Sequence, residues 1–242
     1  MKKIISILHF HLFTFARSSK YVMPLSVLIF LQLSLYITAR GEPADFVSGI
    51  FLAEIFAFVI AIWVGFTSSR WTDEITEQLL ILRAKSDVFY YSIYVVFLFV
   101  ISIFISLISV VIPIIFHLLD TDFFQQFTIA YISHSFLLLI GSSFAGLSLG
   151  ALFHPRIMFD SETPLYVVIA GLVSITRNPI VNRYEIFQYI LWFLPNVSAH
   201  HAIIDDSSYF TFLIVGRLFL ISMLYGVCYS FIKIVLLSRK KF

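Results

Sequence analysis

The sequence predicts an all-α membrane protein with six transmembrane helices. Hydrophobic residues make up 60% of its 242 positions, charged residues only 12%, and the mean hydropathy is +0.97. Ordinary soluble domains contain about 25% charged residues. One crossing of the bilayer core takes about 20 apolar residues, so the chain has room for six spans joined by short loops. We therefore expect one transmembrane domain over residues 1–242 and no separate enzyme domain.

The amino-terminal residues 1–20 predict an interfacial helix. At about 100° per residue, apolar and polar side chains separate onto opposite sides. The apolar side is formed by Ile4, Ile5, Leu8, Leu12 and Phe15, and the polar side by Lys2, Lys3, Ser6, His9, Arg17 and Lys20. Such a helix lies in the membrane–water boundary. The alternative is a poorly ordered terminus.

Six apolar stretches are the expected spans. They cover residues 21–39, 47–66, 88–118, 127–153, 164–176 and 209–236. The third is long enough to tilt, or to bend near Pro113. The fifth is short for a full crossing. In the fourth, Ser142, Gly146 and Gly150 recur at four-residue intervals, a pattern that favours close helix packing. The alternative is glycine used for local flexibility.

The loop at residues 67–87 predicts a short amphipathic helix. Thr72 is its expected cap, acidic residues Asp73 and Glu74 fill its first turn, and Arg83 and Lys85 its last. One of its faces is apolar, formed by Ile75, Leu79 and Leu82.

A second irregular region, residues 177–208, lies between the last two spans. Its apolar part, residues 186–194, is too short to cross a bilayer and ends at Pro195. A segment of this kind predicts a re-entrant or interfacial structure, because its backbone needs protein or water as a partner.

The distribution of Lys and Arg predicts the orientation, because cytoplasmic loops carry an excess of both. With the amino terminus inside, the inner side holds twelve of the 16 basic residues: Lys2, Lys3, Arg17, Lys20, Arg70, Arg83, Lys85, Arg156, Lys233, Arg239, Lys240 and Lys241. The outer side holds Arg40, Arg177 and Arg183, and Arg217 lies within a span. Both termini and the 67–87 helix are therefore expected in the cytoplasm.

Three ionisable residues fall inside the expected spans. Glu54, His134 and Arg217 all lie roughly 10–12 Å below the outer surface at about 1.5 Å per residue. Buried charges are costly in a bilayer, and an ion pair of Glu54 with Arg217, with His134 nearby, would relieve that cost. Depth alone does not show that these side chains face one another. Such a pair either locks helices together or contacts a substrate.

The loop before the last span holds four potential metal ligands, His200, His201, Asp205 and Asp206. Adjacent histidines point in different directions on any regular element, and no spacing fixes a ligand set. A solvated loop is the favoured interpretation, and no metal is expected. The formal charge of +2 gives no indication of a nucleic-acid partner.

The layout resembles the permease subunits of type-2 ATP-binding-cassette (ABC) exporters. Two segments carry the resemblance: residues 71–86, WTDEITEQLLILRAKS, are similar to the acidic, leucine-rich coupling segment of that family, and residues 194–203, LPNVSAHHAI, to its proline-containing stretch before the final span. The resemblance implies a coupling helix that docks on an ATPase. Its contact residues would be Asp73, Glu74, Glu77, Gln78, Leu79, Leu82 and Arg83.

The chain contains no Gly-x-x-x-x-Gly-Lys-Ser/Thr run that would surround a nucleotide's phosphates. The resemblance therefore implies a transport subunit without cofactor, with ATP and Mg²⁺ in a separate cytoplasmic ATPase and a second permease copy or paralogue as partner. The expected setting is a cell membrane, in bacteria, and the expected cargo is a peptide, a bacteriocin or an amphiphilic compound. The alternatives are an intramembrane enzyme, with Glu54 and His134 as its acid–base pair, and an ion-driven secondary transporter.

Overall fold

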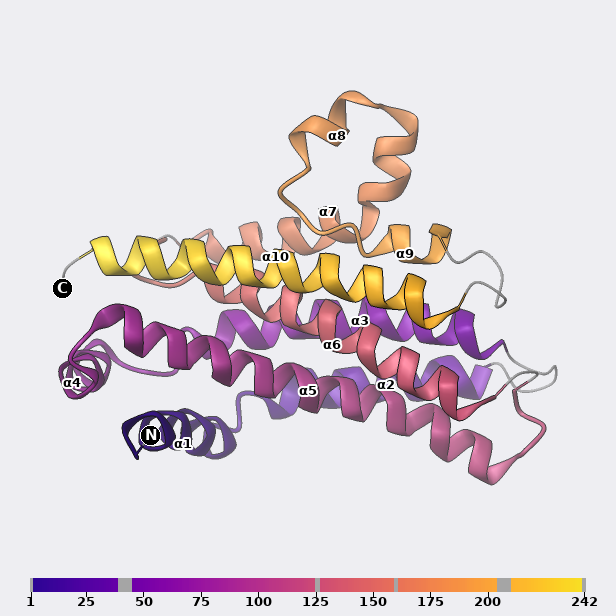
Figure 1. The fold of residues 1–242 in the computed structure, drawn as a ribbon, viewed down its shortest axis with the longest axis horizontal. Coiled ribbons are helices and arrows are strands. Elements are labelled where there is room, and N and C mark those ends of the chain that lie inside the picture. The colour runs from indigo at the N-terminus through magenta and orange to yellow at the C-terminus, as the bar shows by residue number, and fades with distance from the viewer. Residues whose placement is uncertain (1, 39–44, 125–126, 159–160, 204–209, 241–242) are drawn as a thin grey trace.

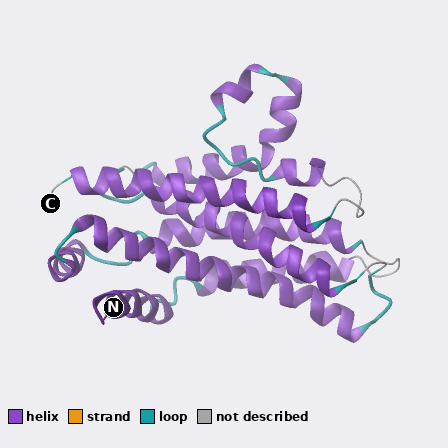
Figure 2. Ribbon diagram, in the orientation of Figure 1, coloured by secondary structure: helices purple, strands orange, loops and turns teal. Residues whose placement is uncertain are grey.

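The computed structural model describes residues 2–38, 45–124, 127–158, 161–203 and 210–240, and the regular structure within them is helical (Figures 1 and 2). The helices are α1 (Lys2–Arg17), α2 (Val22–Thr38), α3 (Phe46–Ser68), α4 (Glu74–Ala84), α5 (Asp87–Leu119), α6 (Ile129–Leu152), α7 (Thr163–Arg183), α8 (Ile186–Ile190), α9 (Ser198–Ile203) and α10 (Phe212–Arg239). The predicted all-α class is confirmed.

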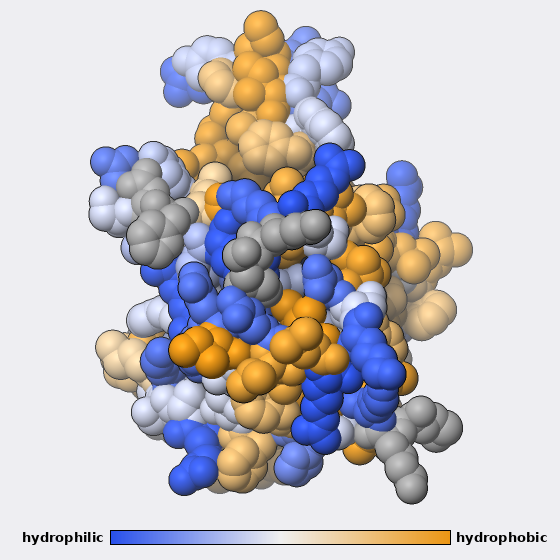
Figure 3. Space-filling model, turned by 90° about the vertical axis from the view of Figure 1, so that its left-hand side faces the viewer, coloured by the Kyte–Doolittle hydropathy of each residue, from blue (hydrophilic) through white to orange (hydrophobic). Residues whose placement is uncertain are grey.

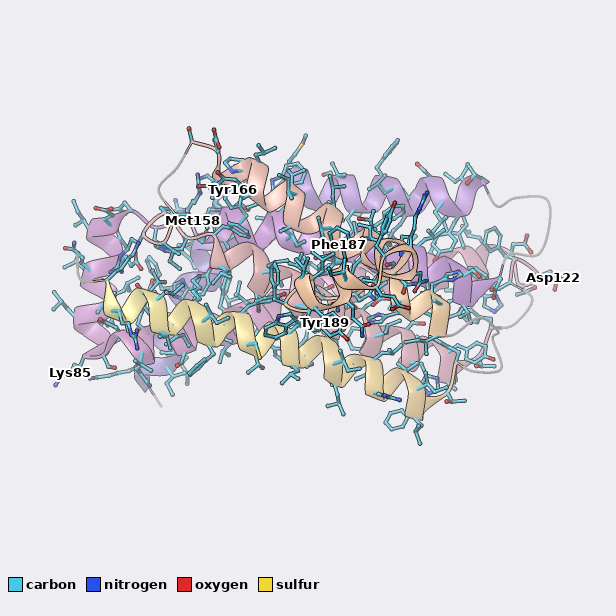
Figure 4. The ribbon with its side chains drawn as sticks, turned by 90° about the horizontal axis from the view of Figure 1, so that it is seen from above. Lys85, Asp122, Met158, Tyr166, Phe187 and Tyr189 are labelled. Carbon is cyan, nitrogen blue, oxygen red and sulfur yellow. The ribbon has the colours of Figure 1, made fainter. Side chains whose placement is uncertain are left out.

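The long helices run side by side along the long axis of the molecule (Figure 1). Helix α6 is central and packs against α3, α5 and α10. Lys85 lies at one end of the bundle and Asp122 at the other (Figure 4). We call these the α4 end and the far end. The amino-terminal helix and the last turns of α10 lie at the α4 end, where Ile7 and Leu237 share a buried cluster with Leu80 of α4.

Five helices are long and apolar enough to cross a membrane: α3, α5, α6, α7 and α10. Helix α2 has only 17 residues, and it qualifies only together with α1, from which it is bent by 69°. Five or six spans therefore define a multi-pass membrane protein. Pro113 lies within α5, which is one helix over 33 residues.

The fifth span is longer than the expected 164–176. Helix α7 continues to Arg183 and has 21 residues. The prediction ended the span before the first cation, Arg177. In the structure the Arg177 guanidinium donates to the Leu194 carbonyl and to the Tyr225 hydroxyl, and these partners allow a charged residue within the helix. Arg177 and Arg183 therefore belong to α7 and not to a loop.

Helix α1 turns a different face to the bundle than the sequence predicted. Ile7, His11 and Phe15, at four-residue spacing, are buried, whereas Ile4 and Ile5 are exposed. The His11 ring lies 5.4–5.6 Å from the rings of three aromatic residues of α5, Tyr90, Tyr94 and Phe97. His11, which neither predicted side includes, is therefore buried in an aromatic environment.

Helix α4 lies across the end of the bundle, nearly perpendicular to the long helices (Figure 1). Its cap is Asp73, whose carboxylate accepts a hydrogen bond from the Thr76 backbone N–H, and not the predicted Thr72. Lys85 ends it in the left-handed conformation, with φ of 66°. The left-handed residue ends α4, and α5 begins two residues later at Asp87.

The region predicted as irregular, 177–208, contains the end of α7, then α8 and α9. Helix α8 stands away from the side of the bundle and has no buried residue (Figures 1 and 4). Helix α9 instead packs against α7 and α3. Arg40, which was predicted on the outer side, and the pair Asp205 and Asp206 lie outside the described residues.

The small residues of α6 lie where it approaches α3 most closely. A Cβ atom added to Gly146 would lie 2.7 Å from the Phe58 carbonyl oxygen, and one added to Gly150 would lie 2.1 Å from that of Ile62. Ser142, one turn earlier, is buried against the same helix. This close approach brings the polar side chain of Glu54 in α3 within reach of α6.

Candidate functional site

Glu54 is the centre of a buried polar group between three helices. Its carboxylate accepts a hydrogen bond from the Ser142 hydroxyl of α6, and its Oε1 lies 2.7 Å from the imidazole Nδ1 of His200 in α9. The Glu54 side chain is only 1% exposed, and its Oε2 has no hydrogen-bond partner among the described residues. The group ties α9 to α3 and α6.

The predicted ion pair of Glu54 with Arg217 is wrong, since His200 occupies that place. Val215, Leu218 and Ser222 form the buried face of α10, and Arg217 lies exposed on another face. His134 also turns elsewhere, with its Nδ1 3.1 Å from the Phe210 carbonyl oxygen. The similar depths of Glu54, His134 and Arg217 in the membrane therefore did not place them in one site, because the direction of a helical side chain depends on how the helix is rotated.

The Glu54 group is not arranged for nucleophilic catalysis. Such a site needs a hydroxyl that donates to a base, with a third group that orients the base. Here Ser142 donates to the carboxylate and not to the imidazole of His200. The acid–base pair of Glu54 and His134, which an intramembrane enzyme would need, is not assembled either.

Of the four candidate metal ligands, only His200 and His201 lie in the described part of the chain, and they point to different neighbours. His200 faces Glu54, and the His201 ring lies 5.5 Å from the ring of Phe51. The described residues contain no group of three His, Cys, Asp or Glu side chains placed to hold a metal ion.

A second buried polar group lies at the α4 end, around Glu77. The Tyr91 hydroxyl of α5 donates to Glu77 Oε1 over 2.6 Å, and Arg156 donates to the Tyr91 oxygen over 2.7 Å. Arg156 Nη1 and His154 Nε2 also lie 3.5 and 3.9 Å from Glu77 Oε1. Glu77 thus joins α4 to α5 and to the loop after α6.

Lys233 and Tyr94 lie next to this Glu77 group. The ammonium of Lys233, on α10, lies 3.8 Å from the centre of the Tyr94 ring, a favourable cation–π geometry. Burial, with smaller effects of the cations Lys233, Arg156 and Arg70, lowers the pKa of His154 to about 2. Burial outweighs the attraction of the Glu77 carboxylate at 3.9 Å, so His154 is neutral at physiological pH.

The outward face of α4 is apolar. Ile75, Leu79 and Leu82 are 69%, 61% and 73% exposed, although they are large aliphatic side chains. Figure 3 looks at this end and shows an apolar patch with hydrophilic atoms around it. We call these three residues the α4 strip. An exposed apolar patch with a polar rim marks an interaction surface.

The residues expected to contact an ATPase divide between the two faces of α4. Asp73, Glu74 and Arg83 are exposed beside the α4 strip, together with its members Leu79 and Leu82, and Gln78 is half-buried. Glu77 faces inward, so its predicted place on a docking surface is wrong. Hydrogen bonding to the Thr76 side chain and, to a lesser extent, to its backbone N–H keeps the pKa of Asp73 low, and Asp73 is therefore a carboxylate at neutral pH.

Sequence reasoning missed Tyr91, His154, Arg156 and Lys233 as members of the Glu77 group. Lys233 was counted as a surface charge, although the apolar residues Ile232, Ile234 and Val235 surround it in sequence. That pattern is a signal for a buried cation. The other three carry no local signal, because α4, α5 and the 154–156 segment meet only in three dimensions.

The fold and its buried polar groups define an all-helical, multi-pass membrane protein. No protein-family model, curated protein or solved structure matches the chain significantly.

Proposed function

We propose that the chain is the membrane-spanning permease subunit of an ABC exporter, and that it moves a peptide or an amphiphilic compound outward with ATP hydrolysed by a separate subunit. The observation that carries this proposal is α4: a short helix across the end of the bundle, with the α4 strip exposed and Glu77 anchored inside. A helix with an apolar stripe fits a groove on a partner protein.

In this proposal the α4 end faces the cytoplasm, where the ATPase binds. The excess of Lys and Arg supports this side, because Arg83, Lys85 and Arg156 gather there with the end of α10. A displacement of α4 is transmitted to α5 through the Glu77–Tyr91 hydrogen bond, and to the loop after α6 through Arg156. Movement of the ATPase is thereby passed to the spans.

A second copy of the permease, or a paralogue, completes the transporter. The support is α8 with the residues that follow it: Ile186, Tyr189 and Trp192 are 67%, 79% and 67% exposed on a segment beside the bundle. Lipid alone covers the side chains but does not pair with backbone groups at a helix end. A protein partner supplies both apolar contacts for the side chains and hydrogen-bond partners for the backbone groups.

The experiment is co-purification of the tagged chain with the ATPase encoded beside it, in neutral detergent, for wild type and for Leu79→Asp. We expect the substitution to abolish co-purification and cargo-stimulated ATP hydrolysis, since it places a charge in the centre of the α4 strip. The matched control is Leu119→Asp, at another exposed leucine, at the end of α5 away from α4, which should retain both. Undiminished co-purification of Leu79→Asp would overturn the proposal.

A further inference from the structure

A chamber of about 180 Å³ lies between α7, α9 and α10. Its polar wall is formed by Arg177, Asn196, His200, Ser222 and Tyr225, and apolar residues such as Leu218 and Ile221 form the rest. We call it the Arg177 chamber. Its volume is below the roughly 300 Å³ at which pockets for whole drug-sized molecules begin. It therefore suits a head group, with the remainder of the molecule outside.

Arg177 is a cation within a candidate membrane-spanning helix, and its guanidinium has neutral partners. It donates to the Leu194 carbonyl and, over 3.4 Å, to the Tyr225 hydroxyl. None of the ion pairs among the described residues includes Arg177, and its Nε is buried without a hydrogen-bond partner there. A charge at this depth is costly unless an anion compensates it.

Glu54, a buried acid that contacts the lining residue His200, is already engaged. Glu54 is bound by Ser142 and by His200, and the His200 side chain lines the chamber. The wall that faces the chamber thus presents a guanidinium, an imidazole and the hydroxyls of Ser222 and Tyr225. Guanidinium groups bind carboxylate and phosphate oxygens in a forked geometry.

We propose that the Arg177 chamber binds the oxyanion head group, a carboxylate or a phosphate, of an amphiphile whose apolar part stays outside the chamber. Arg177 makes the main contact, and the hydroxyls of Ser222 and Tyr225 donate secondary hydrogen bonds to the oxyanion. To do so, the Tyr225 hydroxyl turns away from the Trp192 carbonyl, to which it donates over 2.8 Å in this structure. This assignment rests on the proposed function only where it makes the amphiphile the exported cargo. Binding itself is a property of this chain alone.

The test is binding of a fluorescent C12 fatty acid to the purified full chain in neutral detergent, with the matching fatty alcohol as the uncharged probe. We expect the acid to bind at least about tenfold more tightly than the alcohol, and Arg177→Gln to remove that difference. Arg217→Gln, which removes an exposed cation of α10, should leave it unchanged. Equal binding of acid and alcohol by wild type would overturn the proposal.

Two further arms keep the result clear. If Arg177→Gln fails to fold, the milder substitutions Tyr225→Phe and Ser222→Ala take its place. Each should weaken binding of the acid and leave binding of the alcohol unchanged. Unchanged binding of the acid by both variants would also count against the site. Millimolar inorganic phosphate or acetate that displaces the acid shows that the free anion suffices, and no displacement shows that the head group needs its chain. Since the ATPase is absent, Leu79→Asp should bind normally even if it uncouples transport.

Discussion

The Tyr91 hydroxyl donates a 2.6 Å hydrogen bond to the Glu77 carboxylate and so fastens α4 to α5. Arg156 holds the same hydroxyl from the other side over 2.7 Å, and each of the three groups comes from a different element. Hydrogen bonds to a charged group are stronger than neutral ones, and their loss leaves a buried carboxylate with fewer partners. The Tyr91 oxygen is therefore one of the contacts that hold α4 in place, together with Arg156 and the buried cluster around Leu80.

Tyr91→Phe should loosen α4 without disturbing the spans. The ring stays, and the missing hydroxyl costs about 1–3 kcal/mol because Glu77 and Arg156 each lose a partner. Hydrogen exchange of α4 amides should accelerate, while amides of α6 remain as protected as in wild type. Tyr189→Phe, at an exposed tyrosine of α8, is the control. Unchanged exchange in α4 would show that Tyr91 is not its anchor.

Gly150→Ala should destabilise the packing of α6 on α3. The added Cβ would lie 2.1 Å from the Ile62 carbonyl oxygen, so the helices must separate, at a cost of about 1–3 kcal/mol. Gly216→Ala is the matched control, because an added Cβ there meets no atom within 4 Å. It should gain up to about 1 kcal/mol of helix propensity. Thermal unfolding in detergent distinguishes the two, and equal melting temperatures would contradict the packing.

A double-mutant cycle should detect Glu54–His200 coupling. Glu54→Ala leaves the Ser142 hydroxyl and the His200 imidazole without their buried acceptor, so we expect a loss of about 1–3 kcal/mol. The cycle with His200→Ala should give a coupling energy of about 0.5–3 kcal/mol, as contacting residues do. The cycle of Glu54→Ala with Arg217→Ala should give none, and coupling there would restore the ion pair that the sequence predicted.

His154 should make stability depend on pH. Its pKa falls from 6.5 in the unfolded chain to about 2 in the folded one, so the folded state resists protonation. Its contribution is complete above pH 6.5 and declines as the pH falls from 6.5 towards 2, by up to about 1.4 kcal/mol per unit. Between pH 7.5 and 5.5, wild type should lose more stability in detergent than His154→Gln. Parallel pH profiles would contradict the buried, neutral histidine.

Much of the fold could be predicted because lipid imposes one strong rule. Apolar runs of at least 17 residues that satisfy their own backbone can only be helices, and this rule placed α2, α3, α5, α6 and α10 within a few residues. The rule failed at α7, where Arg177 was taken as an end. The structure continues the helix, since partners from other segments accept the guanidinium.

The candidate sites were less predictable, because they depend on which way helices face. Composition and spacing identified Glu54 as a buried acid and the α4 strip as an apolar face. They chose the wrong partner for Glu54 and turned Glu77 outward. His200 was known only as one of two adjacent loop histidines, and a six-residue helix far along the chain brings it to Glu54.

The sequence by itself determined that this protein lies in a membrane, that it is helical and where most helices begin and end. Hydrophobicity is a property of neighbouring residues, so a local pattern suffices for it. Only the tertiary structure decided that Glu54 meets His200, that Glu77 meets Tyr91 and that Arg177 lines a chamber. Each of these contacts depends on the rotation and crossing of packed helices, and packing is a property of the whole bundle.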